Sequence, residues 1–207
     1  MTNLQSPLKW TGSKRKLVDD LLKHVPAEYG AYHEPFVGGG SLFFALQPKR
    51  SYLSDANGRL VKMYQAIRDY VEDVIDDLLL FQNDKAFFEQ MRQTDIDQCN
   101  PDETAAWMIC LNKTCYNGLY RVNKKGKFNV PFGKYANPTI CNADLLRECA
   151  KALRTASLNR EDFAFSLRDG HVAEGDLVYS DPPYIPLNAT SNFTSYMIMI
   201  NTKTGFK

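Results

Sequence analysis

An Asp-Pro-Pro-Tyr tetrad at residues 181–184 carries the most specific chemistry in this sequence. It follows an apolar stretch, residues 176–180, that we expect to form a short buried strand. Two consecutive prolines cannot continue a sheet ladder, and they hold the backbone extended and rigid. That shape can aim the Asp181 carboxylate and the Pro182 carbonyl at one exocyclic amino group, which frees its nitrogen lone pair to attack a methyl sulfonium. The Tyr184 ring could stack on a planar base held outside a duplex.

A glycine-rich turn is the second candidate for chemistry. Residues 34–40 read Glu-Pro-Phe-Val-Gly-Gly-Gly, and Asp55 follows some fifteen residues later. Glycines after a strand let a ligand approach the backbone, a helix N-terminus adds a favourable dipole, and a carboxylate ending the next strand can bind ribose hydroxyls. The turn lacks GxGxxG, so a nucleoside with an amino-acid tail fits as well as a dinucleotide. Taken alone, the pattern leaves open a turn that binds nothing.

The third candidate is a basic segment between residues 104 and 142, which contains no acidic residue. Aromatic residues are interleaved with its cations, a composition typical of contact with phosphates and unstacked bases. A solvated basic hairpin is the alternative. Acidic residues at 72–77 and 95–97 conceal this segment in a net charge of +1. The cations are Lys113, Arg121, Lys124, Lys125, Lys127 and Lys134.

The elements that must position these residues alternate between helix and strand. We expect a helix at 14–24 with Leu17, Leu21 and Leu22 on one face, a strand at 32–37 and a helix from 41. A strand at 52–55 and one amphipathic helix at 60–81 follow. This order predicts an α/β fold with a parallel sheet.

The middle of the chain departs from that alternation. Residues 105–112 and 145–153 read as helices, whereas 117–133 are rich in Asn, Gly and Lys, and predict a loop or hairpin outside the core. We therefore expect a catalytic core made of residues 1–59 and 151–207. Residues 60–150 would form an inserted, mostly helical module.

Composition bounds the class of protein. With 44% hydrophobic and 24% charged residues, the chain is typical of a soluble globular protein. Five cysteines without a CxxC pair, and no signal peptide, favour a reduced cytoplasmic protein. No apolar run approaches the ~20 residues of a membrane span. The three histidines lack metal-ligand spacing with the cysteines, so we expect no metal, and we expect a monomer.

With these residues in place, the sequence resembles the Dam-type DNA adenine methyltransferases, which act on GATC. The resemblance runs from about Leu8 to Tyr196, in the order of the family. It implies a Rossmann-like sheet that uses S-adenosylmethionine and an inserted module that recognises double-stranded DNA. The matching segments are residues 8–14, 34–40, 116–121, 128–135 and 181–184.

The resemblance also implies roles for single residues. Asp181, Pro182 and Tyr184 would be catalytic, Tyr116 would wedge into the base stack, and Arg121 would read a guanine edge with two hydrogen bonds. The residues that would hold S-adenosylmethionine are Trp10, Lys14, Pro35, Phe36, Gly38, Gly40, Asp55, Asp162, Phe163 and Asp181. Those that would contact DNA are Lys9, Tyr116, Asn117, Leu119, Arg121 and Pro131, to which composition adds Lys124 and Lys125.

The last residues depart from the family. Residues 197–207 do not continue the resemblance, so we expect a sheet that is incomplete at its C-terminal end. The strand before Asp181 would then be an exposed edge. Two alternatives to an active enzyme stay open: a remnant that only binds DNA or cofactor, and an enzyme that methylates cytosine N4 or RNA. Related N4-cytosine enzymes usually carry Ser in place of this Asp, which argues against the latter.

Overall fold

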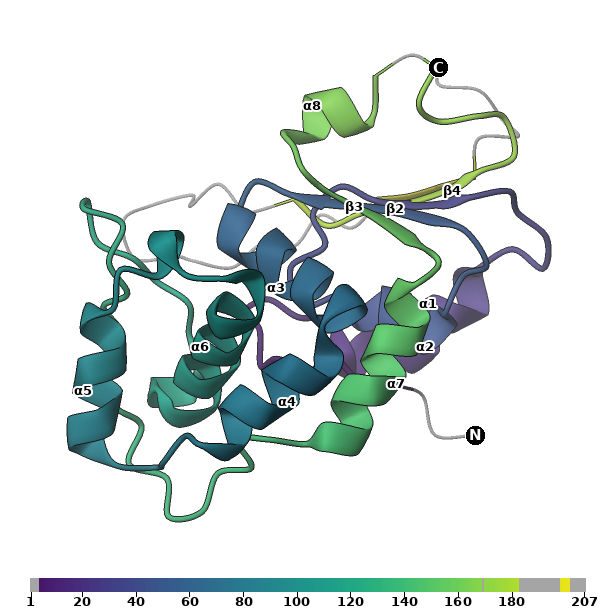
Figure 1. Cartoon of the computed structure of the whole chain (residues 1–207). Coiled ribbons are helices and arrows are strands. Elements are labelled where there is room, and N and C mark those ends of the chain that lie inside the picture. Colours follow the sequence, from purple (N-terminus) through teal and green to yellow (C-terminus); the bar gives the residue numbers. More distant parts are fainter. Residues whose placement is uncertain (1–3, 169, 183–197, 202–207) are drawn as a thin grey trace, which may run out of the picture.

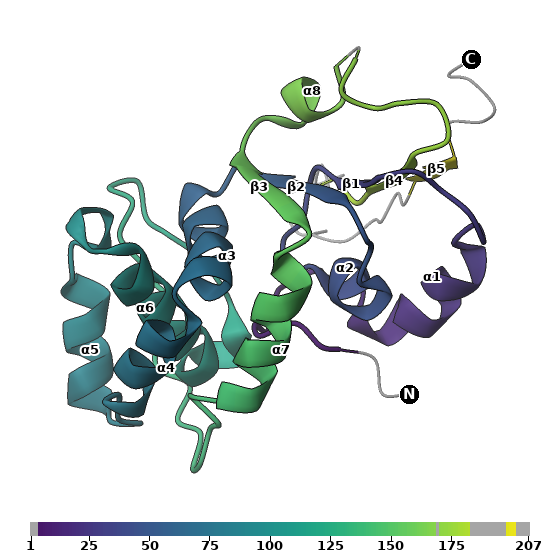
Figure 2. The same ribbon diagram turned by 45° about the vertical axis from the view of Figure 1, so that its right-hand side comes forward.

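The computed structural model describes residues 4–168, 170–182 and 198–201. Within these residues a sheet has the strand order β3-β2-β1-β4-β5 (Figures 1 and 2). The first four strands are parallel, and β5 pairs antiparallel with β4. The strands are β1 (Tyr32–Glu34), β2 (Ser51–Asp55), β3 (Ala156–Arg160), β4 (Leu177–Ser180) and β5 (Ile198–Asn201).

The helices lie mainly on one side of this sheet. Figures 1 and 2 show α1, α2, α3 and α7 beneath one face and α8 above the other. Helix α6 lies farther out, where it packs against α3, α4 and α5. The α-helices are α1 (Val18–His24), α2 (Ser41–Leu46), α3 (Gly58–Asp69), α4 (Val71–Leu79), α5 (Lys85–Gln93), α6 (Pro101–Thr114), α7 (Ala143–Leu153) and α8 (Phe163–Ser166). Short 3-10 turns are η1 (Arg15–Leu17), η2 (Ile96–Gln98) and η3 (Tyr116–Gly118).

One continuous hydrophobic core joins the sheet to the outer helices. Helix α6 is its centre, since every residue from Thr104 to Leu111 is buried whichever way it faces. Its start is fixed by Pro101 at the first position and by Glu103, whose carboxylate accepts the amide hydrogen of Asn100 at 2.8 Å. The predicted helices at 41–46, 105–112 and 145–153 and the strands at 52–55 and 176–180 are confirmed.

The prediction of a single helix over 60–81 is wrong. The chain leaves helical geometry at Tyr70 (φ −137°, ψ 38°), which ends α3 and begins α4. The break lets Val74, Ile75 and Leu78 of α4 turn toward α6 and α7. Continuous amphipathic periodicity did not reveal it, because both helices keep one apolar face.

Two burial predictions near the site also need correction. Leu17 is exposed although Leu21 is buried, because residues 15–17 form a 3-10 turn with three residues per turn. The segment 117–133 is a hairpin-like loop but not outside the core: Phe128 and Val130 are buried, and the Phe128 ring meets Trp107 edge to face at 5.9 Å.

The strand that leads to Asp181 is not an exposed edge, contrary to expectation. Strand β4 lies between β1 and β5, and residues 198–201, for which the sequence predicts no strand, form the strand that covers it. The elements β3 and α5 were not predicted either.

Candidate functional site

A cavity of about 330 Å³ opens where the parallel strands end. Glu34 ends β1, Asp55 ends β2, and Asp181 follows β4, so all three carboxylates meet at one edge of the sheet. All ten residues predicted for cofactor binding line this cavity. They are Trp10, Lys14, Pro35, Phe36, Gly38, Gly40, Asp55, Asp162, Phe163 and Asp181.

The glycine turn forms one wall of the cavity, with Trp10 packed against it. Gly38 has φ +45°, and a Cβ there would lie 2.9 Å from Trp10 Nε1. A Cβ at Gly39 would lie 2.8 Å from Trp10 Cβ. The Tyr64 hydroxyl donates to the Gly38 carbonyl at 2.9 Å. The turn therefore has room for glycine only, and its backbone faces the cavity.

Asp55 is held at the end of β2 by two main-chain amides. Its carboxylate accepts hydrogen bonds from Gly38 N at 3.0 Å and from Asn57 N at 2.8 Å. Burial raises the pKa of Asp55, and these two hydrogen bonds oppose the rise. The carboxylate is therefore fixed in direction where it lines the cavity.

Lys14 and Asp181, which both line the cavity, form a partly buried ion pair. Lys14 Nζ donates to Asp181 Oδ2 at 2.5 Å and to the Gly12 carbonyl at 3.0 Å. Their side chains are only 9% and 16% exposed. The ammonium therefore supplies a nearby countercharge for the carboxylate of the tetrad. Pro182 also lines the cavity, whereas Tyr184 lies outside the described residues.

Glu34 is a site residue for which the sequence predicts no role. It is 3% exposed, it lines the cavity, and it accepts a hydrogen bond from the Tyr32 hydroxyl at 2.8 Å. Burial raises the pKa of Glu34 to about 8; the tyrosine bond opposes this, and the charges of Asp181 and Asp55 add to it. Glu34 could have been predicted from one sequence feature, a carboxylate inside a strand that is expected to be buried.

Two aromatic rings lie beside the cavity. Phe36 and Phe163 have ring centroids 5.3 Å apart at 31°. Phe163 stands at the start of α8, where the Asp162 carboxylate caps the helix by accepting from Ala164 N at 2.9 Å. Residues 162–163 are thus next to the glycine turn, although the two segments are far apart in sequence.

The buried Asn112 joins the N-terminal segment to the hairpin-like loop at residues 117–133, which we call the basic hairpin. Its side chain accepts from Lys9 N at 2.8 Å and donates to the carbonyls of Lys9 at 2.6 Å and of Gly118 at 2.8 Å. Next to this junction, Tyr120 stacks on Trp10 with centroids 5.6 Å apart. Lys9 Nζ lies 4.6 Å from the centre of the Tyr135 ring. The hairpin therefore adjoins the wall of the cavity.

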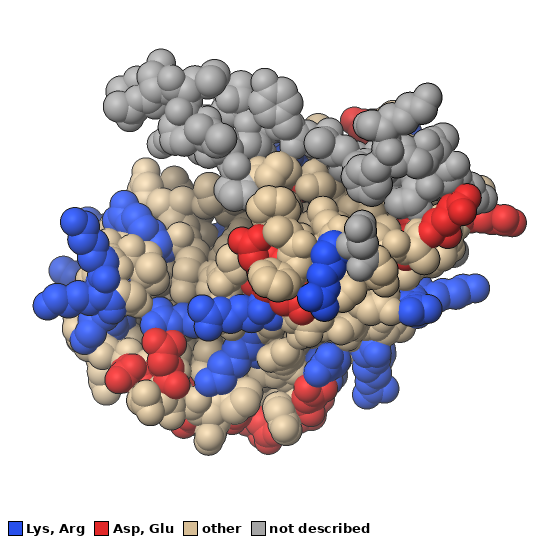
Figure 3. Space-filling model, turned by 90° about the horizontal axis from the view of Figure 1, so that it is seen from above, with Lys and Arg blue, Asp and Glu red and all other residues tan. Residues whose placement is uncertain are grey.

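The side chains predicted to contact DNA lie mostly at the surface of this hairpin. Leu119 is half-buried; the others are exposed, and Figure 3 shows Lys and Arg side chains gathered at the end of the molecule where the hairpin lies. Arg121 donates Nε to Asn129 Oδ1 at 2.7 Å and Nη2 to the Asn129 carbonyl at 3.1 Å, so its direction is set. The exposed residues are Lys9, Tyr116, Asn117, Arg121, Lys124, Lys125 and Pro131.

Fold and site together define an α/β enzyme with a nucleoside-sized cavity at the carboxyl ends of parallel strands, beside a basic hairpin. Residues 10–204 match the model of the D12 class N6 adenine-specific DNA methyltransferases. The chain belongs to this family, which includes the Dam enzymes, and is an adenine-specific DNA methyltransferase.

Individual relatives agree with the family match. The chain is 39% identical to the type II methyltransferase M1.LlaDCHI of Lactococcus lactis over 94% of its own length and 70% of the relative's. It is 39% identical to M.MjaIII of Methanocaldococcus jannaschii over 91% and 72% of the two chains. It is 36% identical to the DNA adenine methylase of Escherichia coli K12 over 91% and 68%.

The family match also corrects the predicted end of the resemblance. It continues to residue 204, beyond Tyr196 and across β5. Among the described residues no helix is long and apolar enough to cross a membrane.

Proposed function

We propose that this methyltransferase takes its methyl group from S-adenosylmethionine and transfers it to adenine N6 in double-stranded DNA at GATC. The main support is one juxtaposition. The cavity that collects ten predicted cofactor residues shares its Trp10 wall with the hairpin that carries the predicted DNA contacts.

The cavity fits this cofactor on the residues that line it. The glycine turn leaves backbone open to a ligand, and the Asp55 carboxylate can accept the hydroxyls of a ribose. Asp162 and Phe163, which also line the cavity, would contact the adenine. The cofactor supplies a methyl group on a sulfonium. Lys14, Pro35, Phe36 and Gly40 complete the proposed set.

Asp181 and Pro182 would prepare the target amino group. The Asp181 carboxylate and the Pro182 carbonyl are acceptors, so they can bind the two amino hydrogens and leave the nitrogen lone pair directed at the methyl group. Lys14 keeps the carboxylate in place through its ion pair. Asp181 need not be a strong base, because the proton can leave after the methyl transfer. Tyr184 is proposed to stack on the extruded adenine.

The hairpin would select the sequence. Arg121, oriented by Asn129, would read guanine, Tyr116 would fill the gap left by the adenine, and Leu119 and Pro131 would meet a thymine methyl. Lys9 and Asn117 would contact the duplex beside them. Apart from the contact of Lys9, we assign these roles to an inserted module of residues 60–150, and we assign the chemistry to residues 1–59 and 151–207.

Arg121 and Lys125 provide a matched test of the GATC specificity. A bidentate Arg–guanine contact discriminates by ~1–3 kcal/mol, whereas a phosphate contact strengthens binding to all sequences and adds about one unit to the salt slope. Arg121→Ala should therefore narrow the affinity gap between a GATC duplex and one altered at its guanine. Lys125→Ala should lower both affinities together. Titrations of both duplexes at several salt concentrations measure this.

One outcome would remove the main support for GATC. If Arg121→Ala lowers both affinities equally and flattens the salt slope, Arg121 holds a phosphate and reads no base.

A further inference from the structure

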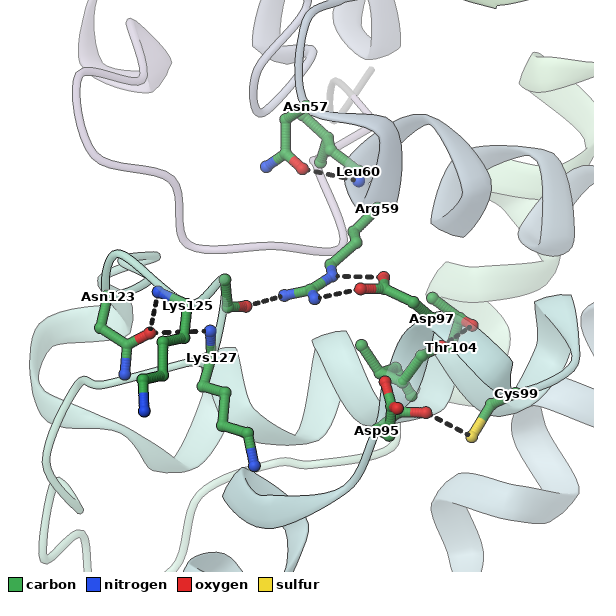
Figure 4. A network of polar contacts seen from close by, with 12 residues as sticks. Asn57, Arg59, Leu60, Asp95, Asp97, Cys99, Thr104, Asn123, Lys125 and Lys127 are labelled. Atoms are coloured by element: carbon green, nitrogen blue, oxygen red, sulfur yellow. Dashed lines mark hydrogen bonds and ion pairs between the residues drawn. The ribbon is translucent and has the colours of Figure 1, made fainter.

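Arg59 joins three segments that are far apart in the sequence. It lies in the first turn of α3, where its Nε and Nη2 donate to the two carboxylate oxygens of Asp97 at 2.9 and 2.7 Å. Its Nη1 donates to the carbonyl of Gly126, in the turn of the basic hairpin, at 2.7 Å. Figure 4 shows the Arg59 guanidinium with Asp97 on one side and Asn123, Lys125 and Lys127 on the other. The Arg59 side chain is 19% exposed, and its guanidinium lies 5.8 Å from the centre of the Trp107 ring.

Stability of α3 does not explain a cation at this position. The N-terminal end of a helix carries a partial positive charge, so an arginine in the first turn is opposed by the helix dipole. The stabilisation that Arg59 provides comes from outside the helix, through the fork with Asp97 and the bond to the hairpin. The hydrogen bonds from Arg59 lower the pKa of Asp97, which keeps this carboxylate ionised as a partner.

Asp97 is itself on a fixed support. It belongs to η2, whose Ile96 is buried, and the Ile96 carbonyl accepts a hydrogen bond from Cys99 N at 3.3 Å. Lys62 of α3 donates to the Cys99 carbonyl just beyond η2, at 2.7 Å. Asp97 therefore holds the Arg59 guanidinium through Nε and Nη2, and Nη1 is left to donate to the hairpin.

The turn that Arg59 contacts is rigid within itself. Asn123 Oδ1 accepts the amide hydrogens of Lys125 at 2.9 Å and of Lys127 at 3.1 Å. Asn123 N also donates to the Lys127 carbonyl, and Gly126 closes the turn with φ +72°. Lys124, Lys125 and Lys127 are exposed on it. A single anchor on Gly126 thus sets the position of three cations at once.

The first turn of α3 is also connected to the cavity. Asn57, two residues before Arg59, caps α3 and donates its amide hydrogen to Asp55, whose second oxygen accepts from Gly38. The first turn of α3 is thereby bound to the cavity on one side and to the basic turn on the other. Phosphate contacts set the register of a protein on a duplex.

We propose that Arg59 is a positioning residue that fixes the basic turn Asn123–Lys127 relative to the cavity, so that its lysines meet the phosphates of the bound duplex. This inference rests on the proposed role of the hairpin in binding DNA. It assigns Arg59 no contact with DNA, cofactor or the reacting atoms.

Arg68 provides a matched control on the same helix. Its Nε and Nη2 form the same kind of fork with Asp69, at 2.8 and 2.9 Å, and its Nη1 donates to a backbone carbonyl, that of Ala156, at 3.2 Å. These partners lie outside the hairpin. Arg59→Met and Arg68→Met therefore remove equivalent bonds and keep the apolar stem of each side chain. Only the first releases the basic turn.

The first measurement is duplex affinity at several salt concentrations between about 50 and 200 mM, with a GATC duplex as the probe. Arg59→Met should bind about tenfold more weakly at low salt, and its salt slope should fall by about one unit for each phosphate that the turn no longer reaches. Arg68→Met should keep the wild-type affinity and slope. Equally weakened binding in both variants, or wild-type binding by Arg59→Met, would overturn the proposal.

A second measurement does not depend on DNA. Digestion with a protease that cuts after lysine should cleave Arg59→Met at Lys124, Lys125 or Lys127 about tenfold faster than wild type or Arg68→Met. Unchanged cleavage at these sites would refute the anchoring. If the turn is released but wild type binds no duplex, the proposed function fails while the anchoring stands.

A second variant applies if Arg59→Met fails to fold. Asp97→Asn weakens the paired hydrogen bonds with Arg59 and keeps Arg59 itself, so it should show the same two changes at smaller size. Wild-type affinity and wild-type cleavage in Asp97→Asn would overturn the proposal.

Discussion

At the scale of single residues, the cavity is notable for its charges. Glu34, Asp55 and Asp181 line it together, and Lys14 pairs with the last of them. Three carboxylates near one another cannot all be ionised at low cost, and Glu34 is the most buried of them. A neutral Glu34 at physiological pH would reduce the repulsion while still accepting the hydrogen bond from Tyr32.

The protonation of Glu34 predicts a specific pH dependence of stability. Burial raises its pKa from an ordinary 4.5 to about 8, so folding takes up a proton between these values. The contribution of Glu34 to stability is complete below pH ~4.5 and is lost as the pH rises through about 8. Glu34→Gln does not titrate and keeps an acceptor for the Tyr32 hydroxyl. The free energy of unfolding of Glu34→Gln minus that of wild type should therefore increase from pH 5 to 8, by up to about 1.4 kcal/mol per pH unit.

Urea unfolding at pH 5, 6, 7 and 8 measures that difference. Glu174→Gln, which alters an exposed acid, is the control. Parallel pH profiles of the free energy of unfolding for wild type and Glu34→Gln would contradict the prediction. Glu34 would then have the same ionisation state in the folded and in the unfolded protein.

At the scale of elements, the junction between the N-terminal segment and the hairpin depends on one side chain. Asn112→Ala removes three hydrogen bonds and leaves polar groups of Lys9 and Gly118 without that partner in a buried place. We expect it to lower the free energy of unfolding by about 2–4 kcal/mol. Asn159→Ala, at an exposed asparagine of β3, should change it by less than about 0.5 kcal/mol. Chemical denaturation of the two variants measures this, and equal stabilities would contradict the role of Asn112.

Elements with a strong local pattern were predictable from the sequence, and others were not. Helix α6 and strand β2 carry such patterns. Strand β3 was missed because only Ala156 and Leu158 are buried in it, which leaves little apolar signal. The burial of Phe128 depends on packing against Trp107 of α6, and the break at Tyr70 falls within a continuous apolar periodicity, so no local pattern encodes either of them.

At the scale of the whole molecule, the ten residues predicted for cofactor binding came from the order of motifs in the sequence, and all ten line one cavity. Parallel strands end at the same edge, so Asp55 and Asp181 could be expected to meet there. The links between cavity and hairpin could not, because Trp10–Tyr120 and Arg59–Gly126 join residues whose types carry no pairing information. Strand β5 was not predicted, because residues 198–201 lie outside the motifs by which the sequence resembles the family.

Methyl transfer by the purified chain is the sharpest test of the proposed reaction. S-adenosylmethionine labelled in its methyl group is incubated with a GATC duplex, and the DNA is digested to nucleosides, which are separated. We expect label in N6-methyladenine with wild type. We expect at least about 100-fold less with Asp181→Asn, the loss typical of removing one group that acts in the transition state. Label in N4-methylcytosine, an unchanged rate in Asp181→Asn, or duplex binding by wild type without any incorporated label would contradict it.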